Sequence, residues 1–271
     1  MKELLIRSVS GLLMGILLLT CVFVSPWSWA ALLLFIIAVG TYEMARLLKM
    51  DTPEGILIGE AVVMGFFALP ALVALEVVAP RWLLFELPMV MVPFLYALFS
   101  VKHDAKPIFT YLFASITFLS LPASLMIFLY REDLFGQLAG PRLIILVFCI
   151  LWINDIFAYL TGRLLGKHKL FERISPGKTI EGSLGGLLFT LVSVVVFCHF
   201  SGWLSLPLAI GLGVIAVVFG TLGDLCESML KRQAGVKDSG KLIPGHGGIL
   251  DRFDSVMISM PFVFVYLYLL L

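Results

Sequence analysis

Nine long apolar runs occupy most of the chain, and they constrain the fold more than any motif does. A helix that crosses a membrane needs about 20 mostly apolar residues. Runs of this kind cover 8–25, 28–46, 56–79, 82–101, 108–130, 142–162, 183–201, 205–228 and 254–271. Only 14% of the residues are charged, against about 25% in a typical soluble domain, and the mean hydropathy is +1.06. The sequence therefore predicts an all-α polytopic membrane protein with about nine transmembrane helices.

The distribution of lysine and arginine predicts how these helices are oriented, because cytosolic loops are enriched in both residues. With a cytosolic N-terminus, 16 of the 19 lysine and arginine residues, Lys102 among them, fall in cytosolic segments. Only Arg81, Arg131 and Arg142 fall outside. We therefore expect a cytosolic N-terminus and an external C-terminus. The first apolar run is followed by a poor cleavage site and at once by a second run, so we expect an uncleaved first span.

Polar motifs are concentrated in the second half of the chain. Residues 1–140 hold about five spans, whereas residues 141–271 hold the remaining spans and the two cytosolic loops richest in lysine and arginine, 163–182 and 229–253. The net charge is +1, and nothing in the sequence indicates nucleic-acid binding. The four cysteines lie in apolar runs without metal-ligand spacing, so we expect neither disulfides nor a zinc site. Chemistry on a charged, water-soluble reactant is therefore expected at the two cytosolic loops.

The loop 229–253 has the composition of a phosphate and metal site. Five glycines fall between positions 235 and 248, and successive backbone N–H groups in such a loop can bind an anion. Asp251 and Asp254 are three residues apart, on one face of a helix, and carboxylates are ligands that Mg²⁺ prefers. A plain basic loop that contacts anionic lipid headgroups would explain the cations but not the glycines and aspartates. The cations around the glycines are Lys231, Arg232, Lys237, Lys241 and Arg252.

Two glycine motifs in this loop do not carry the function that their spacing suggests. Gly235 to Lys241 has the spacing of a P-loop, but Leu242 stands where the metal-binding serine or threonine belongs, and an apolar span precedes it in place of a strand. Gly245, Gly247 and Gly248 likewise lack the βαβ context of a dinucleotide site.

Ionisable residues inside the apolar runs predict a polar cavity. Such residues are costly in a membrane and face the protein interior, a cavity or a partner. Asp224 lies near the cytosolic end of the eighth run, and Asn154 and Asp155 lie deep in the sixth. We expect Asp224 to join Asp251 and Asp254 around a metal ion; the alternative is an interfacial acid paired with Lys231.

The loop 163–182 contains Ser175-Pro176-x-Lys178-Thr179-x-Glu181, which can cap and start the seventh span because serine and threonine are common N-cap residues. Since both cationic loops lie on the same side of the membrane, we expect them to bind one ligand together. His246 is a candidate hydrogen-bond donor to a phosphate.

Three of these segments resemble the phosphatidate cytidylyltransferases (CDP-diacylglycerol synthases). The resemblance covers about 154–254 and is carried by Ser228-x-x-Lys231-Arg232, Lys237-Asp238 and Pro244-x-His246-Gly247-Gly248-x-x-Asp251-Arg252-x-Asp254. It implies transfer of the cytidylyl group of CTP to phosphatidate, with CDP-diacylglycerol and pyrophosphate as products. It also implies Mg²⁺ with a second cation, K⁺ or Mg²⁺, a homodimer, and a place in the bacterial inner (cell) membrane with the site facing the cytosol.

The predicted site residues combine the motifs with the resemblance. The predicted metal ligands are Asp224, Asp251 and Asp254. The predicted catalytic residues are Asp224, Asp251, Lys231, Arg232 and Lys237. The predicted substrate-binding residues are Asn154, Asp155, Ser175, Lys178, Glu181, Lys241, Gly245, His246, Gly247, Gly248 and Arg252.

Two other functions fit part of the pattern. A CTP-dependent polyprenol or phytol kinase would transfer the γ-phosphoryl group and would need a base for the alcohol. An ion-coupled transporter could use Asp155 and Asp224 as coupling sites, but it would leave the two cationic loops unexplained.

Overall fold

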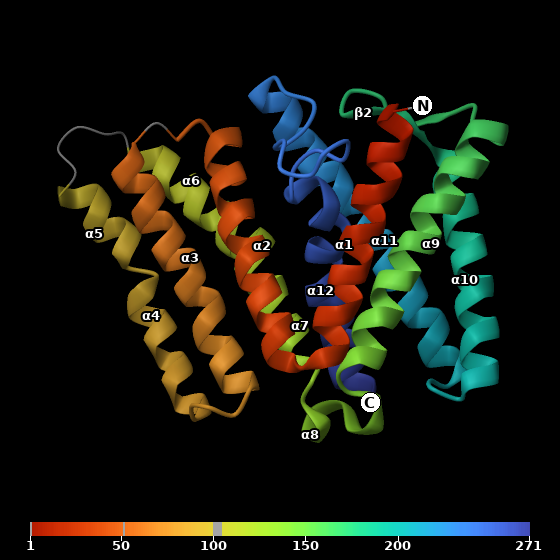
Figure 1. The fold of residues 1–271 in the computed structure, drawn as a ribbon, viewed down its shortest axis with the longest axis horizontal. Helices are drawn as coiled ribbons and strands as arrows, with labels where there is room; N and C mark the ends of the chain where they lie inside the picture. Colours follow the sequence, from red (N-terminus) through yellow and green to blue (C-terminus); the bar gives the residue numbers. More distant parts are fainter. Residues whose placement is uncertain (1, 51, 100–104) are drawn as a thin grey trace.

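The computed structural model describes residues 2–50, 52–99 and 105–271, and its helices stand side by side along one common direction (Figure 1). In these ranges, nine helical segments are long and apolar enough to cross a membrane, so the predicted number of spans is confirmed. The two ends of the chain lie at opposite ends of the bundle. Lys102 and the last two positions of the predicted span 82–101 lie outside the described residues. The nine segments are Leu5–Val24, Pro26–Leu47, Pro53–Ala74, Pro80–Phe99, Lys106–Phe128, Pro141–Leu165, Ile180–Ser201, Leu206–Ala234 and Leu250–Leu270.

The first three spans are continuous helices: α1 (Lys2–Val24), α2 (Pro26–Leu47) and α3 (Pro53–Ala74). The turn between α1 and α2 is fixed by a capping box. The Ser25 hydroxyl accepts from the Ser28 N–H at 3.0 Å, and the Ser28 hydroxyl accepts from the Ser25 N–H at 3.0 Å. These bonds satisfy backbone donors that a helix start leaves unpaired.

The fourth and fifth spans are interrupted, and proline accounts for part of this. The fourth consists of the 3₁₀ helix η1 (Pro80–Phe85), α4 (Glu86–Met89) and α5 (Val92–Phe99). The fifth consists of α6 (Ala105–Ser115), the π-helical turn η2 (Ile116–Ser120) and α7 (Leu121–Phe128). Pro122 follows the π turn directly and has no N–H to continue an α-helical ladder, so the widened turn accommodates it.

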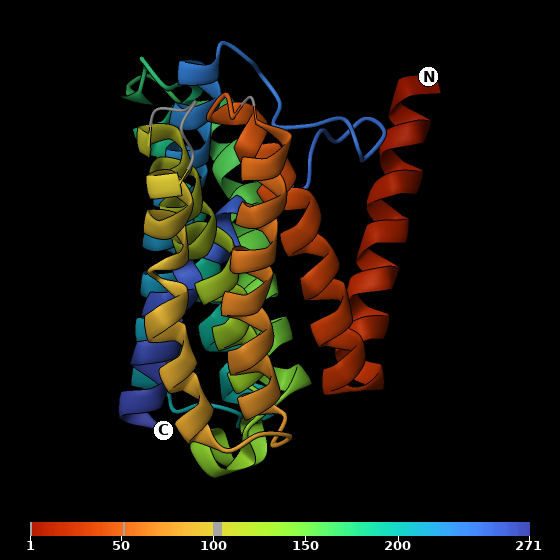
Figure 2. The same cartoon turned by 90° about the vertical axis from the view of Figure 1, so that its left-hand side faces the viewer.

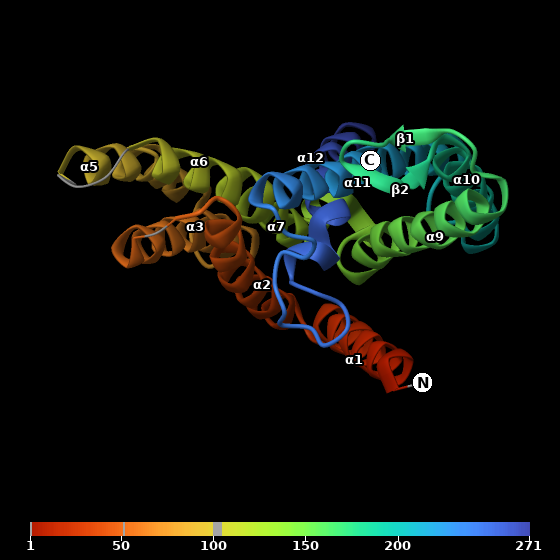
Figure 3. The ribbon, with the colours of Figure 1, turned by 90° about the horizontal axis from the view of Figure 1, so that it is seen from above.

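The C-terminal half carries four long helices. A short turn of α8 (Glu132–Phe135) and the 3₁₀ helix η3 (Gly136–Leu138) leads into the first of them. These helices are α9 (Pro141–Leu165), α10 (Ile180–Ser201), α11 (Leu206–Ala234) and α12 (Leu250–Leu270). In Figure 3, α9 and α10 lie side by side, and α11 packs against both α10 and α12.

An antiparallel hairpin of β1 (Lys169–Phe171) and β2 (Ser175–Thr179) connects α9 to α10. The sequence did not predict it. Ser175 lies in β2 and does not start the seventh span, so that part of the prediction was wrong. Thr179 is the N-cap of α10, and its hydroxyl accepts from the Gly182 N–H at 3.1 Å. Strands of three and five residues are too short to show an alternating pattern that could be distinguished from a helix start.

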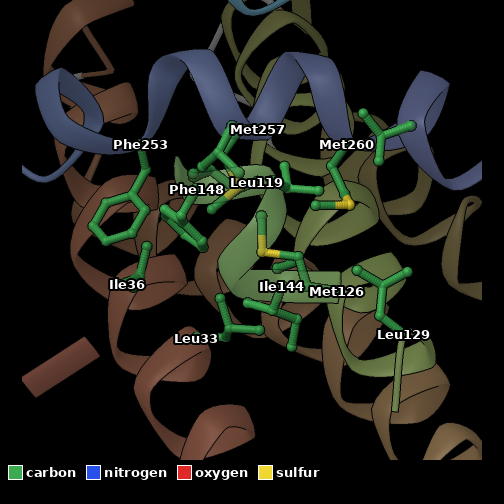
Figure 4. Close-up of a cluster of buried hydrophobic side chains, with 14 of the residues drawn as sticks. Leu33, Ile36, Leu119, Met126, Leu129, Ile144, Phe148, Phe253, Met257 and Met260 are labelled. Atoms are coloured by element: carbon green, nitrogen blue, oxygen red, sulfur yellow. The ribbon is translucent and has the colours of Figure 1, made fainter. Parts of the chain in front are cut away.

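One apolar core joins the two halves of the chain. Figure 4 shows α12 side chains such as Met257 and Met260 packed against Ile36 of α2, Leu119 of η2 and Phe148 of α9, and all five are buried. The core therefore crosses the predicted boundary at residue 140. It fixes the loop-bearing start of α12 relative to α2 and α9.

Glycines allow α11 and α12 to approach closely. A Cβ atom on Gly223 would lie 2.6 Å from the backbone oxygen of Asp254 and 2.9 Å from Cβ of Ile258. Helices in membranes commonly use small residues at such contacts because dispersion between backbones stabilises the pair.

We predict that Gly223→Ala lowers stability by about 1–3 kcal/mol through overpacking. Gly15→Ala is the matched control, because a Cβ on Gly15 of α1 would meet no atom within 4 Å. Both changes gain the same helix propensity, so their difference isolates the packing at Gly223. Thermal unfolding of the purified variants in detergent measures it, and equal melting temperatures would contradict the close contact.

Candidate active site

A polar cavity of about 430 Å³ lies between α9, α10, α11 and the β hairpin. The cavity brings together residues that are far apart in the chain, because each of these elements contributes polar groups to it. Asn154, Asp155 and Asp224 line it, as predicted. Its lining residues are Asn154, Asp155, Ala158, Tyr159, Gly162, Arg163, Ser175, Gly177, Lys178, Thr179, Gly182, Ser183, Thr221 and Asp224.

Lys178 connects the hairpin to α11 by an ion pair between its Nζ and the carboxylate of Asp224. Both side chains are partly exposed to the cavity. The predicted alternative, in which Asp224 pairs with Lys231, is wrong in this structure. The two cationic loops of the sequence therefore meet here, since Lys178 comes from one loop and Asp224 lies on the helix that leads to the other.

A cluster of three carboxylates lies beside the cavity. One oxygen from each of Asp224, Glu227 and Asp254 lies within 4.8 Å of the others. Glu227 is 0% exposed and Asp254 is 9% exposed. Oε1 of Glu227 is buried without a hydrogen-bond partner among the described residues. Three hard oxygen donors, one of them unpaired, fit a divalent cation such as Mg²⁺.

Lys231 connects the carboxylate cluster to Asp251, which anchors the glycine loop. Its Nζ forms an ion pair with Glu227 and another, at 2.6 Å, with Oδ1 of Asp251. The lysine side chain is 11% exposed, and a buried cation of this kind needs close anionic partners to offset the loss of water.

Asp251 anchors the glycine loop and does not join the acidic cluster. Its Oδ2 accepts from the N–H of Ser239 at 2.9 Å, the hydroxyl of Ser239 at 3.0 Å and the N–H of Gly248 at 2.8 Å. Its Oδ1 is taken by Lys231. The prediction grouped Asp251 with Asp224 and Asp254, but in the structure Glu227 takes that place. The reason is that Asp251 lies in the first turn of α12, where the free N–H groups of the preceding loop compete for its oxygens.

Glu43 of α2 is a second loop anchor, and the sequence analysis missed it. It is 3% exposed, and its Oε2 accepts from the Ser239 hydroxyl at 2.8 Å and the Leu250 N–H at 3.0 Å. Its Oε1 accepts from the Ile249 N–H at 3.0 Å. The carboxylate thus caps the start of α12, where a negative charge is favourable. A glutamate inside a predicted span was the available signal.

The tip of the glycine loop reaches α1, as Figures 2 and 3 show. The Ser10 hydroxyl donates to the Pro244 oxygen at 2.9 Å and lies 2.8 Å from Nδ1 of His246. Gly245 and Gly247 have φ values of 77° and 87°, which favour glycine. His246 therefore contacts α1 and does not line the polar cavity. Partial burial and the charges of Arg252 and Arg7 lower the pKa of His246.

The other predicted site residues lie around the cavity or on the loop. Arg232 donates from Nε to the Ile174 oxygen and from Nη1 to the Val236 oxygen, both at 3.3 Å, which ties the hairpin to the end of α11. Glu181 accepts from the backbone N–H groups of Lys167 and His168 and does not line the cavity. Lys237, Lys241 and Arg252 are exposed, and Gly248 is buried in the loop.

A family comparison decides the identity. The model of the family described as "Cytidylyltransferase family" matches residues 5–270. The chain belongs to the cytidylyltransferase family.

Three similar proteins carry the name phosphatidate cytidylyltransferase. The protein of Staphylococcus haemolyticus is 50% identical over 123 residues, 45% of this chain and 47% of that protein. The protein of Staphylococcus saprophyticus is 41% identical over 167 residues, 61% of this chain and 64% of that protein. The protein of Staphylococcus aureus is 49% identical over 123 residues, again 45% and 47%. The chain thus matches about half the length of two of these relatives and under two thirds of the other.

We predict that Glu43→Ala loosens the glycine loop, because the N–H groups of Ile249 and Leu250 lose their acceptor and the Ser239 hydroxyl keeps only Asp251. Buried donors without a partner cost about 1–3 kcal/mol. Hydrogen exchange of residues 239–250 in detergent should accelerate, and the melting temperature should fall. Glu43→Gln keeps one acceptor oxygen and should recover part of both.

Glu54→Ala is the control, since Glu54 is exposed on α3. Unchanged exchange of the loop in Glu43→Ala would show that this carboxylate does not anchor it.

Proposed function

We propose that the protein transfers the cytidylyl group of CTP to phosphatidate in the membrane. The observation that carries this proposal is the juxtaposition of the polar cavity with the buried cluster of Asp224, Glu227 and Asp254. Membership of the cytidylyltransferase family and the names of its similar proteins support the choice of substrates.

We propose that Asp224 and Asp254, with Glu227, hold Mg²⁺. The unpaired Oε1 of Glu227 supports this assignment. A bound divalent cation would screen the negative charge of the nucleotide phosphates and stabilise the departing pyrophosphate. A second cation, K⁺ or Mg²⁺, stays a prediction. Asp251 could become a ligand only if Lys231 and the glycine loop released it, so we assign it to loop anchoring.

The proposed reaction needs no general base. A phosphomonoester has a second pKa of about 6, so the phosphate of phosphatidate is largely a dianion at neutral pH. One of its oxygens attacks the α-phosphorus of CTP, a P–O bond forms, and the bond from that phosphorus to the oxygen bridging to the β-phosphate breaks. The bonding electrons leave with pyrophosphate. The obstacle is repulsion between anions, and Lys178, beside Asp224 at the cavity wall, is placed to lower it.

We propose that the end of the bundle that carries the β hairpin and the glycine loop faces the cytosol of a bacterial cell. The protein is an integral multi-pass membrane protein by its nine apolar helices, and the similar proteins are bacterial. The lysine and arginine distribution supports the sidedness, and CTP is a cytosolic nucleotide. The homodimer rests on the family resemblance alone and stays a prediction.

The test is an assay of the purified protein in detergent with CTP, phosphatidate and Mg²⁺. We predict that a radiolabel at the α-phosphate of CTP enters the lipid product and that a label at the γ-phosphate leaves as pyrophosphate. A chelator should abolish the reaction. Entry of the γ-label into a lipid alcohol would show a kinase, and uptake into vesicles without CDP-lipid would show a transporter.

Variants test whether the carboxylate cluster takes part in the proposed reaction. Asp254→Asn should lower kcat by a factor on the order of 10²–10³, as loss of one stabilising charged group does. Asp133→Asn is the control, because Asp133 lies in α8 at the other end of the bundle, where Arg131 pairs with it and lowers its pKa. Activity of Asp254→Asn near that of the control would contradict the proposed role.

A further inference from the structure

A second, apolar hollow lies on the other side of α9, between α1, α9 and α12. Its volume is about 380 Å³, within the range of ligand sites. Apolar side chains and two glycines form its walls, and Arg252 is the charged residue among them. We call it the α1 groove. Its lining residues are Gly11, Leu12, Met14, Gly15, Ile16, Leu18, Leu19, Phe148, Trp152, Arg252 and Phe253.

One end of the α1 groove is polar, and the rest of its lining is apolar. Arg252 lies in the first turn of α12, at the end of the bundle that carries the glycine loop. Arg7 of α1 reaches the loop as well, since a Cβ on Gly245 would lie 2.7 Å from Cγ of Arg7. The Arg252 guanidinium has no hydrogen-bonded or ion-paired partner among the side chains described in 5–50, 52–99 and 106–271. A cationic side chain at one end of an apolar channel matches the charge of an anionic lipid headgroup above an acyl chain.

The groove adjoins the polar cavity through α9 and Arg252. Phe148 and Trp152 of α9 face the groove, whereas Asn154 and Asp155, one turn further along, face the cavity. Arg252 lines the groove, and Asp254, two residues further along α12, belongs to the acidic cluster with Asp224 beside the cavity. A phosphate held at Arg252 would therefore lie at the boundary between the apolar groove and the cavity assigned to CTP.

We propose that the α1 groove binds an acyl chain of the lipid substrate, a diacyl phosphomonoester, with its phosphate at Arg252. This proposal rests on the proposed function and adds to it the place where the lipid binds. The open space at Gly15, where a Cβ would meet no atom within 4 Å, leaves room for the chain along α1. The polar cavity suits the acyl chain less well, because charged and hydroxyl groups make up much of its lining.

The test is photolabelling of the full-length protein in phosphatidylcholine vesicles with phosphatidate that carries a diazirine in one acyl chain. We expect the label on the α1 segment 11–19 and on α9 between Phe148 and Trp152. Unlabelled phosphatidate should compete, and extra phosphatidylcholine should not. Label spread evenly over lipid-facing helices, or removed equally by phosphatidylcholine, would overturn the proposal, as would a crosslink showing a second copy of the chain in the groove.

Gly15→Phe fills the groove, and Leu13→Phe is its control because Leu13 is 60% exposed on α1 and does not line the groove. Displacing two methylene groups weakens binding roughly tenfold. We therefore expect Gly15→Phe to lose the groove label and to raise the KM for long-chain phosphatidate at least about tenfold, with the KM for CTP unchanged. Leu13→Phe and the KM for dihexanoyl phosphatidate should show little change.

The two proposals fail separately. A wild-type protein that makes no CDP-lipid but shows the competed label would refute the function and keep the groove as a site for this lipid. An active enzyme in which Gly15→Phe and Leu13→Phe behave alike would refute the groove and keep the function.

Discussion

Three carboxylates gathered in a membrane-embedded part of the protein are the constraint on which the rest of the structure depends. Asp224, Glu227 and Asp254 approach within 4.8 Å, and Lys178 and Lys231 offset only part of their charge. Burying several acids in a low-dielectric region is costly unless cations or hydrogen bonds compensate. An arrangement held together at that cost suits a site that binds a cation and, through it, phosphates. The surrounding helices supply rigid support for this cluster.

The glycine loop is held by two acids that stay outside the cluster. The Ser239 hydroxyl lies within hydrogen-bonding distance of both Glu43 and Asp251, so one residue connects α2 with the start of α12. Glu43 also accepts two N–H groups at this helix start. These hydrogen bonds therefore fix the conformation of the loop, although it is rich in glycine. Its tip on α1 brings His246 beside Ser10, while Arg252 of α12 lines the α1 groove and Asp254 lies in the carboxylate cluster.

The sequence predicted the elements with strong periodic or compositional signals and missed those set by the path of a loop. Nine spans followed from the apolar runs, and Asn154, Asp155 and Asp224 were expected to share a cavity because charged groups in spans must face one. The exchange of Asp251 for Glu227 could not be read in advance, because it depends on N–H groups at 239 and 248 that only the folded loop presents. Glu43 could not be assigned to the glycine loop either, because it lies 196 residues before Ser239 in the chain and contacts the loop only in the folded protein.

The proposed binding of the metal that accompanies CTP to the carboxylates of Asp224 and Asp254 can be tested in a crystal. Anomalous diffraction from crystals grown with Mn²⁺ and a CTP analogue that cannot be cleaved at the α-phosphate tests it most directly. We predict a manganese peak in contact with oxygens of Asp224 and Asp254, with Asp251 still bonded to Lys231 and the loop. A peak bound to Asp251 away from Asp224, or no peak near the cluster while the nucleotide is bound, would contradict the account.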